Sequence, residues 1–101
     1  MNIQILRKLI RNQKYEISHH AQKERYEENI NLEDIEHAVL SGEIIEDYPE
    51  DVRGKSCLIG GYSKQRPIHI VCAALPNGWL RIITVYIPKL PKWITPKQRR
   101  R

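Results

Sequence analysis

The amino-acid sequence predicts an α+β domain in which N-terminal helices pack on a four-stranded antiparallel β-meander. Apolar residues recur at helical spacing before Gly42, whereas runs rich in β-branched and aromatic residues, separated by turn residues, follow it. Helices that precede a set of strands are typical of the α+β class, with the helices on one face of the sheet. We assign residues 1–90 to this single domain and residues 91–101 to a basic C-terminal tail.

The first two helices are predicted from apolar spacing and a capping residue. Residues 2–12 form a short amphipathic helix, and residues 15–17 form either a brief strand or an extended linker. Ser18 resembles the N-cap of a second helix over residues 19–29. This second helix is so polar that it is either solvated or lines a cleft with its charged side chains.

The third helix has the clearest boundaries. Asn31 is its expected N-cap, and Asp34 stands where the acid of a capping box belongs. Gly42 fits the left-handed position that often follows the last helical residue.

Four strands are expected after Gly42. The first two cover Ile44–Tyr48 and Cys57–Tyr62, and Gly60-Gly61 indicates a bulge or a close backbone approach. A hairpin over Pro67–Pro88 supplies the other two strands, with Asn77-Gly78 as a two-residue type I′ turn.

This hairpin creates a polar cluster in an otherwise apolar sheet. Counting outward from the turn pairs Pro76 with Trp79, Ala74 with Arg81, Val71 with Thr84 and His69 with Tyr86. An imidazole beside a phenol and a hydroxyl suits general acid–base chemistry, so this cluster is a candidate reaction centre. It equally suits a hydrogen-bonded polar patch that only stabilises the sheet.

The composition limits the classes of function. The chain has 101 residues, of which 41% are hydrophobic and 29% charged, as in an ordinary soluble domain. No run approaches the roughly 20 apolar residues of a membrane span, and residues 1–10 are too charged for a signal peptide. We therefore expect a cytoplasmic protein without a membrane partner. The net charge of +5 suits polyanion binding, and the basic tail either contacts RNA or is simply solvated; its candidate contacts are Lys97, Arg99, Arg100 and Arg101.

Cysteines and histidines give no metal-binding pattern. Cys57 and Cys72 lack CxxC spacing and fall in expected strands, which favours buried free thiols over a disulfide. Together with His20 and His69 they match no compact zinc-ligand motif. The chain also lacks a glycine-rich phosphate loop and the GxSxG and HExxH motifs. We therefore expect neither a metal nor a cofactor.

Several motifs, spread over most of the chain, resemble one known family. The most specific are His20-Ala21 with Arg25-Tyr26, GEIIEDYP at 42–49, SCL at 56–58, PIH at 67–69 and ITVY at 83–86. From about Tyr15 to Ile94 the sequence thus resembles the bacterial domain-of-unknown-function family 4258. Many members of that family read His-Ala-x-x-Arg with a second Arg four residues on, where this chain has Glu24 and Glu28.

The resemblance implies a fold similar to the RelE/ParE and barnase-like superfold and a toxin of a type II toxin–antitoxin pair. It leads us to expect a metal-independent endoribonuclease, similar to the mRNA interferases. Catalysis by such an enzyme needs a base, an acid and cations for the phosphorane. The candidates are His69 and His20 as base and acid in either order, Arg25 as phosphate ligand, Tyr86 as a positioning or proton-donating group, and Tyr48 and Thr84 as lesser candidates.

The expected partners follow from the same resemblance. One is a cognate antitoxin, possible types of which include a zinc-finger protein. The other is RNA or the ribosome. The alternative is a non-catalytic module that binds an antitoxin or a topoisomerase-type target. In that case the contact between His69 and Tyr86 is a structural hydrogen bond and the basic tail is a docking element.

Overall fold

The α+β class predicted from the sequence is confirmed. The computed structural model describes residues 1–52, 54–89 and 93–99. Within these ranges the helices are α1 (Ile3–Arg11), α2 (His19–Glu27) and α3 (Leu32–Ser41). None of these described helices is long and apolar enough to cross a membrane.

The main sheet differs from the expected meander. Its described strands are β1 (Tyr15–Ile17), β2 (Glu43–Tyr48), β3 (Ser56–Ser63), β4 (Arg66–Ala74) and β5 (Leu80–Tyr86). They lie in the order β1-β5-β4-β3-β2, with β1 parallel to β5 and the other neighbours antiparallel. The expectation of a four-stranded antiparallel sheet is therefore wrong. A three-residue parallel strand was not predictable as part of the sheet, because no local turn joins it to its partner.

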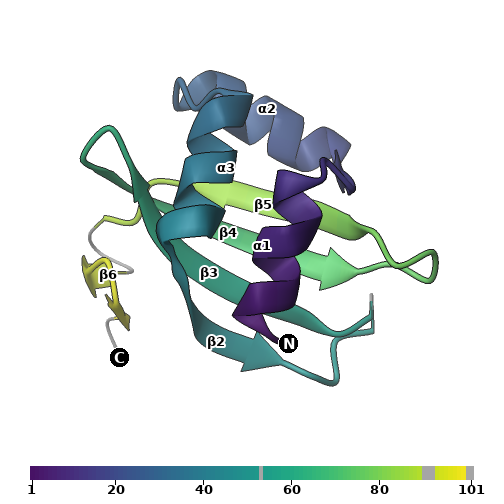
Figure 1. Ribbon diagram of the computed structural model, residues 1–101. Coiled ribbons are helices and arrows are strands. Elements are labelled where there is room, and N and C mark those ends of the chain that lie inside the picture. Colours follow the sequence, from purple (N-terminus) through teal and green to yellow (C-terminus); the bar gives the residue numbers. More distant parts are fainter. Residues whose placement is uncertain (53, 90–92, 100–101) are drawn as a thin grey trace.

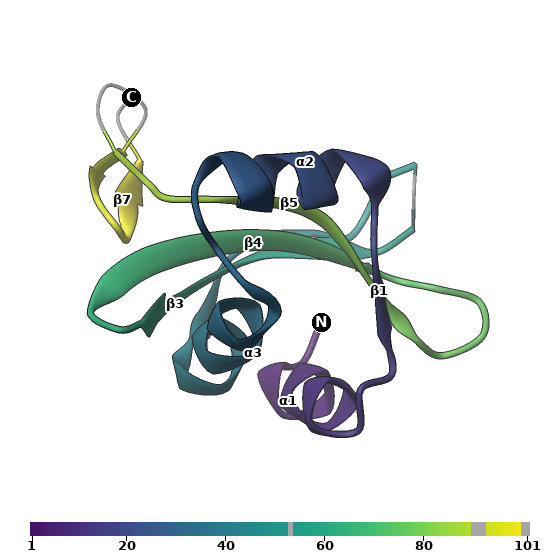
Figure 2. The ribbon, with the colours of Figure 1, turned by 90° about the horizontal axis from the view of Figure 1, so that it is seen from above.

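Different elements pack on the two faces of the sheet. Helices α1 and α3 pack on one face, whereas α2 lies along the β5 edge (Figures 1 and 2). A small hairpin of β6 (Trp93–Thr95) and β7 (Gln98–Arg99) lies on the side away from α1 and α3 (Figure 2). The core between the sheet and the helices includes the almost completely buried side chains of Leu6, Ile10, Ile35, Val39, Ile59, Ile70 and Ile82.

Two glycines let α3 approach β3 closely. A Cβ at Gly61 would lie 1.9 Å from the carbonyl oxygen of Ala38, so the close approach predicted for Gly60-Gly61 is confirmed at Gly61. The left-handed conformation expected for Gly42 is wrong, because its φ is −93° and its ψ is −179°. A Cβ at Gly42 would lie 2.4 Å from the same Ala38 oxygen. Close packing, rather than a backbone turn, therefore requires this glycine.

The capping box predicted for α3 is confirmed and connects the helix to the sheet. Asn31 Oδ1 accepts a hydrogen bond from the Asp34 backbone at 3.0 Å, and Asp34 Oδ2 accepts one from the Asn31 backbone at 2.9 Å. Asp34 is buried, and it also accepts a hydrogen bond from Ser63 Oγ at 2.7 Å and pairs with Arg66 at 3.3 Å. Burial acts to raise the pKa of Asp34, but the hydrogen bonds and the nearby cations hold this pKa below its usual value.

The β4–β5 turn is not the expected two-residue turn. Leu75 receives a hydrogen bond from the Gly78 backbone at 3.0 Å and donates one to the Trp79 carbonyl at 2.9 Å, which leaves residues 76–78 as the loop. Gly78 alone in this loop has a positive φ, of 86°. Pro76 explains the difference: its fixed φ suits the second position of a type I turn, and it has no N–H to donate to Trp79.

A bulge in β5 compensates for this shift. The register moves by one residue between Val71 and Cys72, so that Ile82 pairs with Cys72 and joins the core. The predicted pairs of Ala74 with Arg81 and of Pro76 with Trp79 are wrong; Ala74 pairs with Leu80. Beyond the bulge, the predicted pairs of Val71 with Thr84 and of His69 with Tyr86 are confirmed.

Candidate functional site

Beyond the end of β1, the polar helix α2 lies along the edge of β5 and forms hydrogen bonds with its backbone. Ser18 caps α2 by accepting a hydrogen bond from the Ala21 backbone at 3.0 Å, and its hydroxyl donates to the Ile83 carbonyl at 3.0 Å. Further along, Glu24 Oε1 accepts a hydrogen bond from the Val85 backbone at 3.0 Å. Polar side chains of α2 therefore satisfy backbone groups that an edge strand would expose. Both expected features of this helix are present, because most of its side chains are exposed and His20 at its start lines a cleft.

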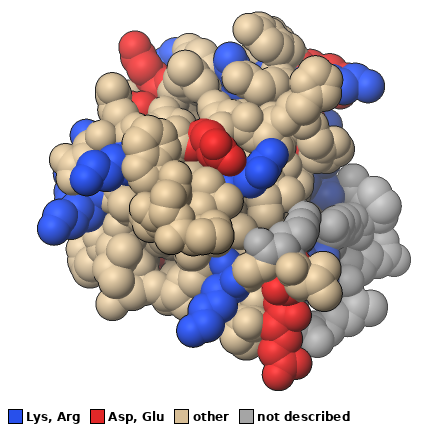
Figure 3. All heavy atoms as spheres, turned by 90° about the vertical axis from the view of Figure 1, so that its right-hand side faces the viewer, with Lys and Arg blue, Asp and Glu red and all other residues tan. Residues whose placement is uncertain are grey.

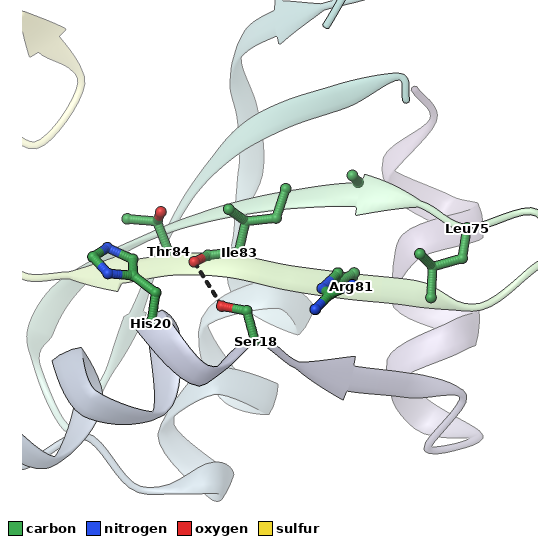
Figure 4. Close-up of a pocket in the computed structure, with 7 residues that line it drawn as sticks. Ser18, His20, Leu75, Arg81, Ile83 and Thr84 are labelled. Carbon is green, nitrogen blue, oxygen red and sulfur yellow. Dashed lines mark hydrogen bonds between the residues drawn. The ribbon is translucent and has the colours of Figure 1, made fainter. Parts of the chain in front are cut away.

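That cleft lies between the start of α2 and the strands β4 and β5. It has a volume of about 450 Å³ and is lined by Ser18, His20, Ala73, Leu75, Arg81, Ile83 and Thr84. Figure 4 shows His20 reaching from α2 toward Thr84 on β5, with Arg81 further along the strand. The lining thus combines aliphatic side chains with an imidazole, a guanidinium and two hydroxyls.

The two ionisable groups of the cleft are accessible and each has an acidic partner. The His20 side chain is 66% exposed, and its Nε2 lies 3.3 Å from Glu24 Oε2. The Arg81 side chain is 48% exposed, and its Nη1 lies 3.5 Å from Glu16 Oε1. Exposed ion pairs are weak in water, so a bound anion can compete with Glu16 for the Arg81 guanidinium.

His69 has a quite different environment. It is completely buried, and its Nδ1 lies 3.2 Å from the Tyr86 hydroxyl, as the sequence led us to expect. Its Nε2 is hydrogen-bonded to the Pro96 carbonyl oxygen. The indole of Trp93 packs edge-on against the imidazole, with ring centroids 4.3 Å apart. Both ring nitrogens are therefore engaged, and the β6–β7 hairpin covers the ring.

An ion pair fastens this hairpin to β2. Arg99 binds Glu46 through two hydrogen bonds, of 2.9 and 2.7 Å, and its guanidinium lies 4.7 Å from the Trp93 ring centre. Tyr48 donates a further hydrogen bond to Glu46. Burial and this hydrogen bond raise the pKa of Tyr48 to about 12. Burial also raises the pKa of Tyr86, against the opposing influence of Trp93 and Arg99.

Four of the predicted residues, His20, His69, Thr84 and Tyr86, lie in two neighbouring environments. The pair of His69 and Tyr86 lies two positions along the β4–β5 ladder from the pair of Val71 and Thr84, and therefore on the same sheet face. Thr84 lines the cleft together with His20, whereas neither His69 nor Tyr86 is among the lining residues. The structure thus brings His69 to Tyr86 and His20 to Thr84, but it does not place the two histidines in one cavity.

Arg25 lies outside both environments. Its Nε donates to Gln22 Oε1 at 2.6 Å, and its guanidinium lies 4.5 Å from the Tyr26 ring centre. It lines a separate shallow cleft with Asn29 and neighbouring residues of the α2–α3 connection, and that cleft shares no residue with the one beside His20. The described neighbours of Arg25 thus belong to α2 and to the α2–α3 connection.

The predicted RNA contacts are described only in part. Lys97 pairs with Glu43 at 2.9 Å, and Arg99 is held by Glu46, while Arg100 and Arg101 lie outside the described residues. On the face shown in Figure 3, basic side chains stand at several separate places with acidic ones among them. Among the described residues, no group of three His, Cys, Asp or Glu side chains is placed to hold a metal ion.

Sequence reasoning missed three residues around these sites. Ser18 was expected only as a cap, and Arg81 was misplaced because the bulge in β5 was not foreseen. Trp93 was assigned to a tail segment, although it is 2% exposed and covers His69. A large aromatic residue within an otherwise polar segment was the one available signal.

Comparison with known proteins identifies the family. No curated protein and no solved structure matches the chain, so the expected similarity to the RelE/ParE superfold stays a prediction. A family model, described as a domain of unknown function (DUF4258), matches residues 17–87. These residues include α2 and the whole lining of the His20 cleft. Because the match covers more than half of the chain, the protein belongs to the DUF4258 family.

Proposed function

We propose that this protein is the toxin of a type II toxin–antitoxin pair and that it cleaves RNA without a metal ion. In this proposal the reacting phosphodiester binds in the cleft between α2 and β5. The observation that carries it is that an exposed imidazole, His20, and an exposed guanidinium, Arg81, line one cleft. Proton transfer and charge stabilisation at a phosphate require these two kinds of group.

The proposed reaction uses the 2′-hydroxyl of RNA as nucleophile. His20 accepts the 2′-hydroxyl proton, the 2′-oxygen bonds to phosphorus, and the bond from phosphorus to the 5′-oxygen breaks. Glu24, 3.3 Å from Nε2, orients the imidazole. Arg81 stabilises the negative charge of the phosphorane. A water molecule protonates the departing 5′-oxygen, and the hydroxide so formed takes back the proton held by His20. The products are a 2′,3′-cyclic phosphate and a free 5′-hydroxyl.

Two other predicted residues take different roles in this proposal. His69 stabilises the fold and takes no part in the reaction, because it is buried and contacts Tyr86, Trp93 and the Pro96 carbonyl oxygen. Arg81 replaces Arg25 as the phosphate ligand, because Arg81 lines the cleft and Arg25 does not.

The test compares RNA cleavage by the purified wild-type protein and by His20→Gln, in buffer containing a metal chelator. His19→Gln is the matched control, since His19 begins the same helix but does not line the cleft. We expect His20→Gln to lose about 100-fold or more in cleavage rate and His19→Gln to match the wild type. Equal rates for all three proteins, or no cleavage of any RNA by the wild type, would contradict the proposal.

A non-catalytic protein-binding function is the second candidate. The observation that favours it is an apolar cleft of about 210 Å³ between α1 and the β4–β5 turn, where Ile5 is 59% and Trp79 40% exposed. Under this function an antitoxin buries both side chains. An Ile5→Asp, Trp79→Ala double variant would then fail to retain the co-expressed antitoxin, whereas the His20→Gln variant would retain it.

A further inference from the structure

The only two cysteines of the chain face each other across neighbouring strands. Cys57 of β3 and Cys72 of β4 are directly paired in the antiparallel ladder, and their Sγ atoms are 3.9 Å apart. Both side chains are completely buried on the core side of the sheet, and both thiols are free. Nothing in the proposed RNA chemistry uses them.

The backbone geometry of this pair suits a disulfide. The Ala74 backbone donates to the Lys55 carbonyl at 3.1 Å, and in an antiparallel ladder hydrogen-bonded pairs alternate with non-bonded ones. The pair two positions along, Cys57 with Cys72, is therefore also hydrogen-bonded, which sets its Cα atoms about 5.5 Å apart. That separation lies at the centre of the range that disulfides span, so side-chain rotation alone can bring the sulfur atoms together.

The surroundings of Cys57 also favour thiol–disulfide exchange. A hydrogen bond from the Cys72 thiol lowers the pKa of Cys57, against the opposing effect of burial. The cover on the core side of the sheet includes α1, a nine-residue helix at the start of the chain (Figure 1). Local opening of such a helix gives a small oxidant a route to the thiols.

We propose that Cys57 and Cys72 form a reversible intramolecular disulfide when the folded protein meets a small-molecule disulfide such as oxidised glutathione. The Cys57 thiolate attacks one sulfur of the oxidant and releases one glutathione thiolate, which takes up a proton. The Cys72 thiolate then attacks Cys57 Sγ in the mixed disulfide and releases the second glutathione. The two cysteines together lose two protons and two electrons, and the oxidant becomes two molecules of reduced glutathione.

The test incubates native wild-type protein with oxidised glutathione, followed by acid quenching and intact-mass measurement. Circular dichroism of the same samples confirms that the protein is folded. We expect a product about 2 Da lighter with no free thiol, which reduced glutathione reverses. The cross-link closes a short loop between positions 57 and 72, so Tm should rise by roughly 10 °C if the native geometry is unstrained.

The Cys72→Ser variant separates this pairing from simple modification. It should stop at a stable glutathione adduct on Cys57, whereas the wild type should not accumulate that adduct. The proposal is overturned if the folded wild type keeps both thiols free, if it accumulates the adduct as the variant does, or if the disulfide forms only in urea. None of these outcomes requires the variant to fold.

Discussion

Replacement of His69 by alanine tests the structural role that its surroundings indicate. The variant loses two hydrogen bonds, to the Tyr86 hydroxyl and the Pro96 carbonyl, worth about 1 kcal/mol each. It also loses the edge-on contact with Trp93, worth about 1 kcal/mol. The cavity left at this fully buried position adds about 1 kcal/mol more. The free energy of unfolding should therefore fall by about 4 kcal/mol, which corresponds to about 20 °C in Tm.

Urea denaturation followed by circular dichroism measures this loss, with His19→Ala as the control. His19 is exposed at the start of α2, so its replacement should change the free energy of unfolding by less than about 0.5 kcal/mol. Tryptophan emission should shift to the red in the folded His69→Ala variant, because Trp93 loses its cover. A loss below about 1 kcal/mol would refute the reasoning, since it would mean that the β6–β7 hairpin is not seated on His69.

Two further predictions concern the attachment of α3. Gly61→Ala should lower the free energy of unfolding by about 3 kcal/mol or more, since its Cβ would lie 1.9 Å from the Ala38 oxygen; unchanged thermal stability would contradict the close approach. Asp34→Asn should lower the free energy of unfolding by about 2 kcal/mol at pH 7, because Ser63 loses a charged acceptor. The pKa of Asp34 is lowered in the folded state, so its stabilising contribution is complete above its unfolded pKa and disappears as pH falls through the folded pKa. The stability difference between wild type and Asp34→Asn should thus shrink below about pH 4, and a constant difference in urea titrations down to pH 2 would contradict this assignment.

The β4–β5 hairpin shows how much of the candidate site the sequence can predict. His69 was placed opposite Tyr86 correctly, although the turn from which the count began was wrong. The three-residue loop shifts the register by one position, and the bulge at Ile83 shifts it back. A turn residue such as Pro76 can be read from its own chemistry. A bulge depends on packing across the sheet, which a single strand's sequence does not reveal.

The sequence predicted contacts between residues close together in the chain, but not contacts between residues on distant segments. The capping box of Asn31 and Asp34 was predictable because both partners lie within one helical turn. The role of Glu24 was not, because its hydrogen-bond partner is the backbone of Val85 on a distant strand. The burial of His69 beneath Trp93 likewise depends on a chain segment that carries no strong strand pattern. For this reason we propose the cleft beside the His69–Tyr86 pair, rather than the pair itself, as the functional site.

An NMR titration can test directly whether RNA binds in the cleft between α2 and β5. A 2′-deoxy dinucleotide, which lacks the attacking hydroxyl, would be added to isotope-labelled protein while amide resonances are followed by NMR. We expect shifts at residues that line the α2–β5 cleft, such as Ser18, His20 and Thr84, and much weaker binding by Arg81→Gln. Shifts confined to the apolar cleft beside Trp79, or none at millimolar dinucleotide, would contradict the proposal.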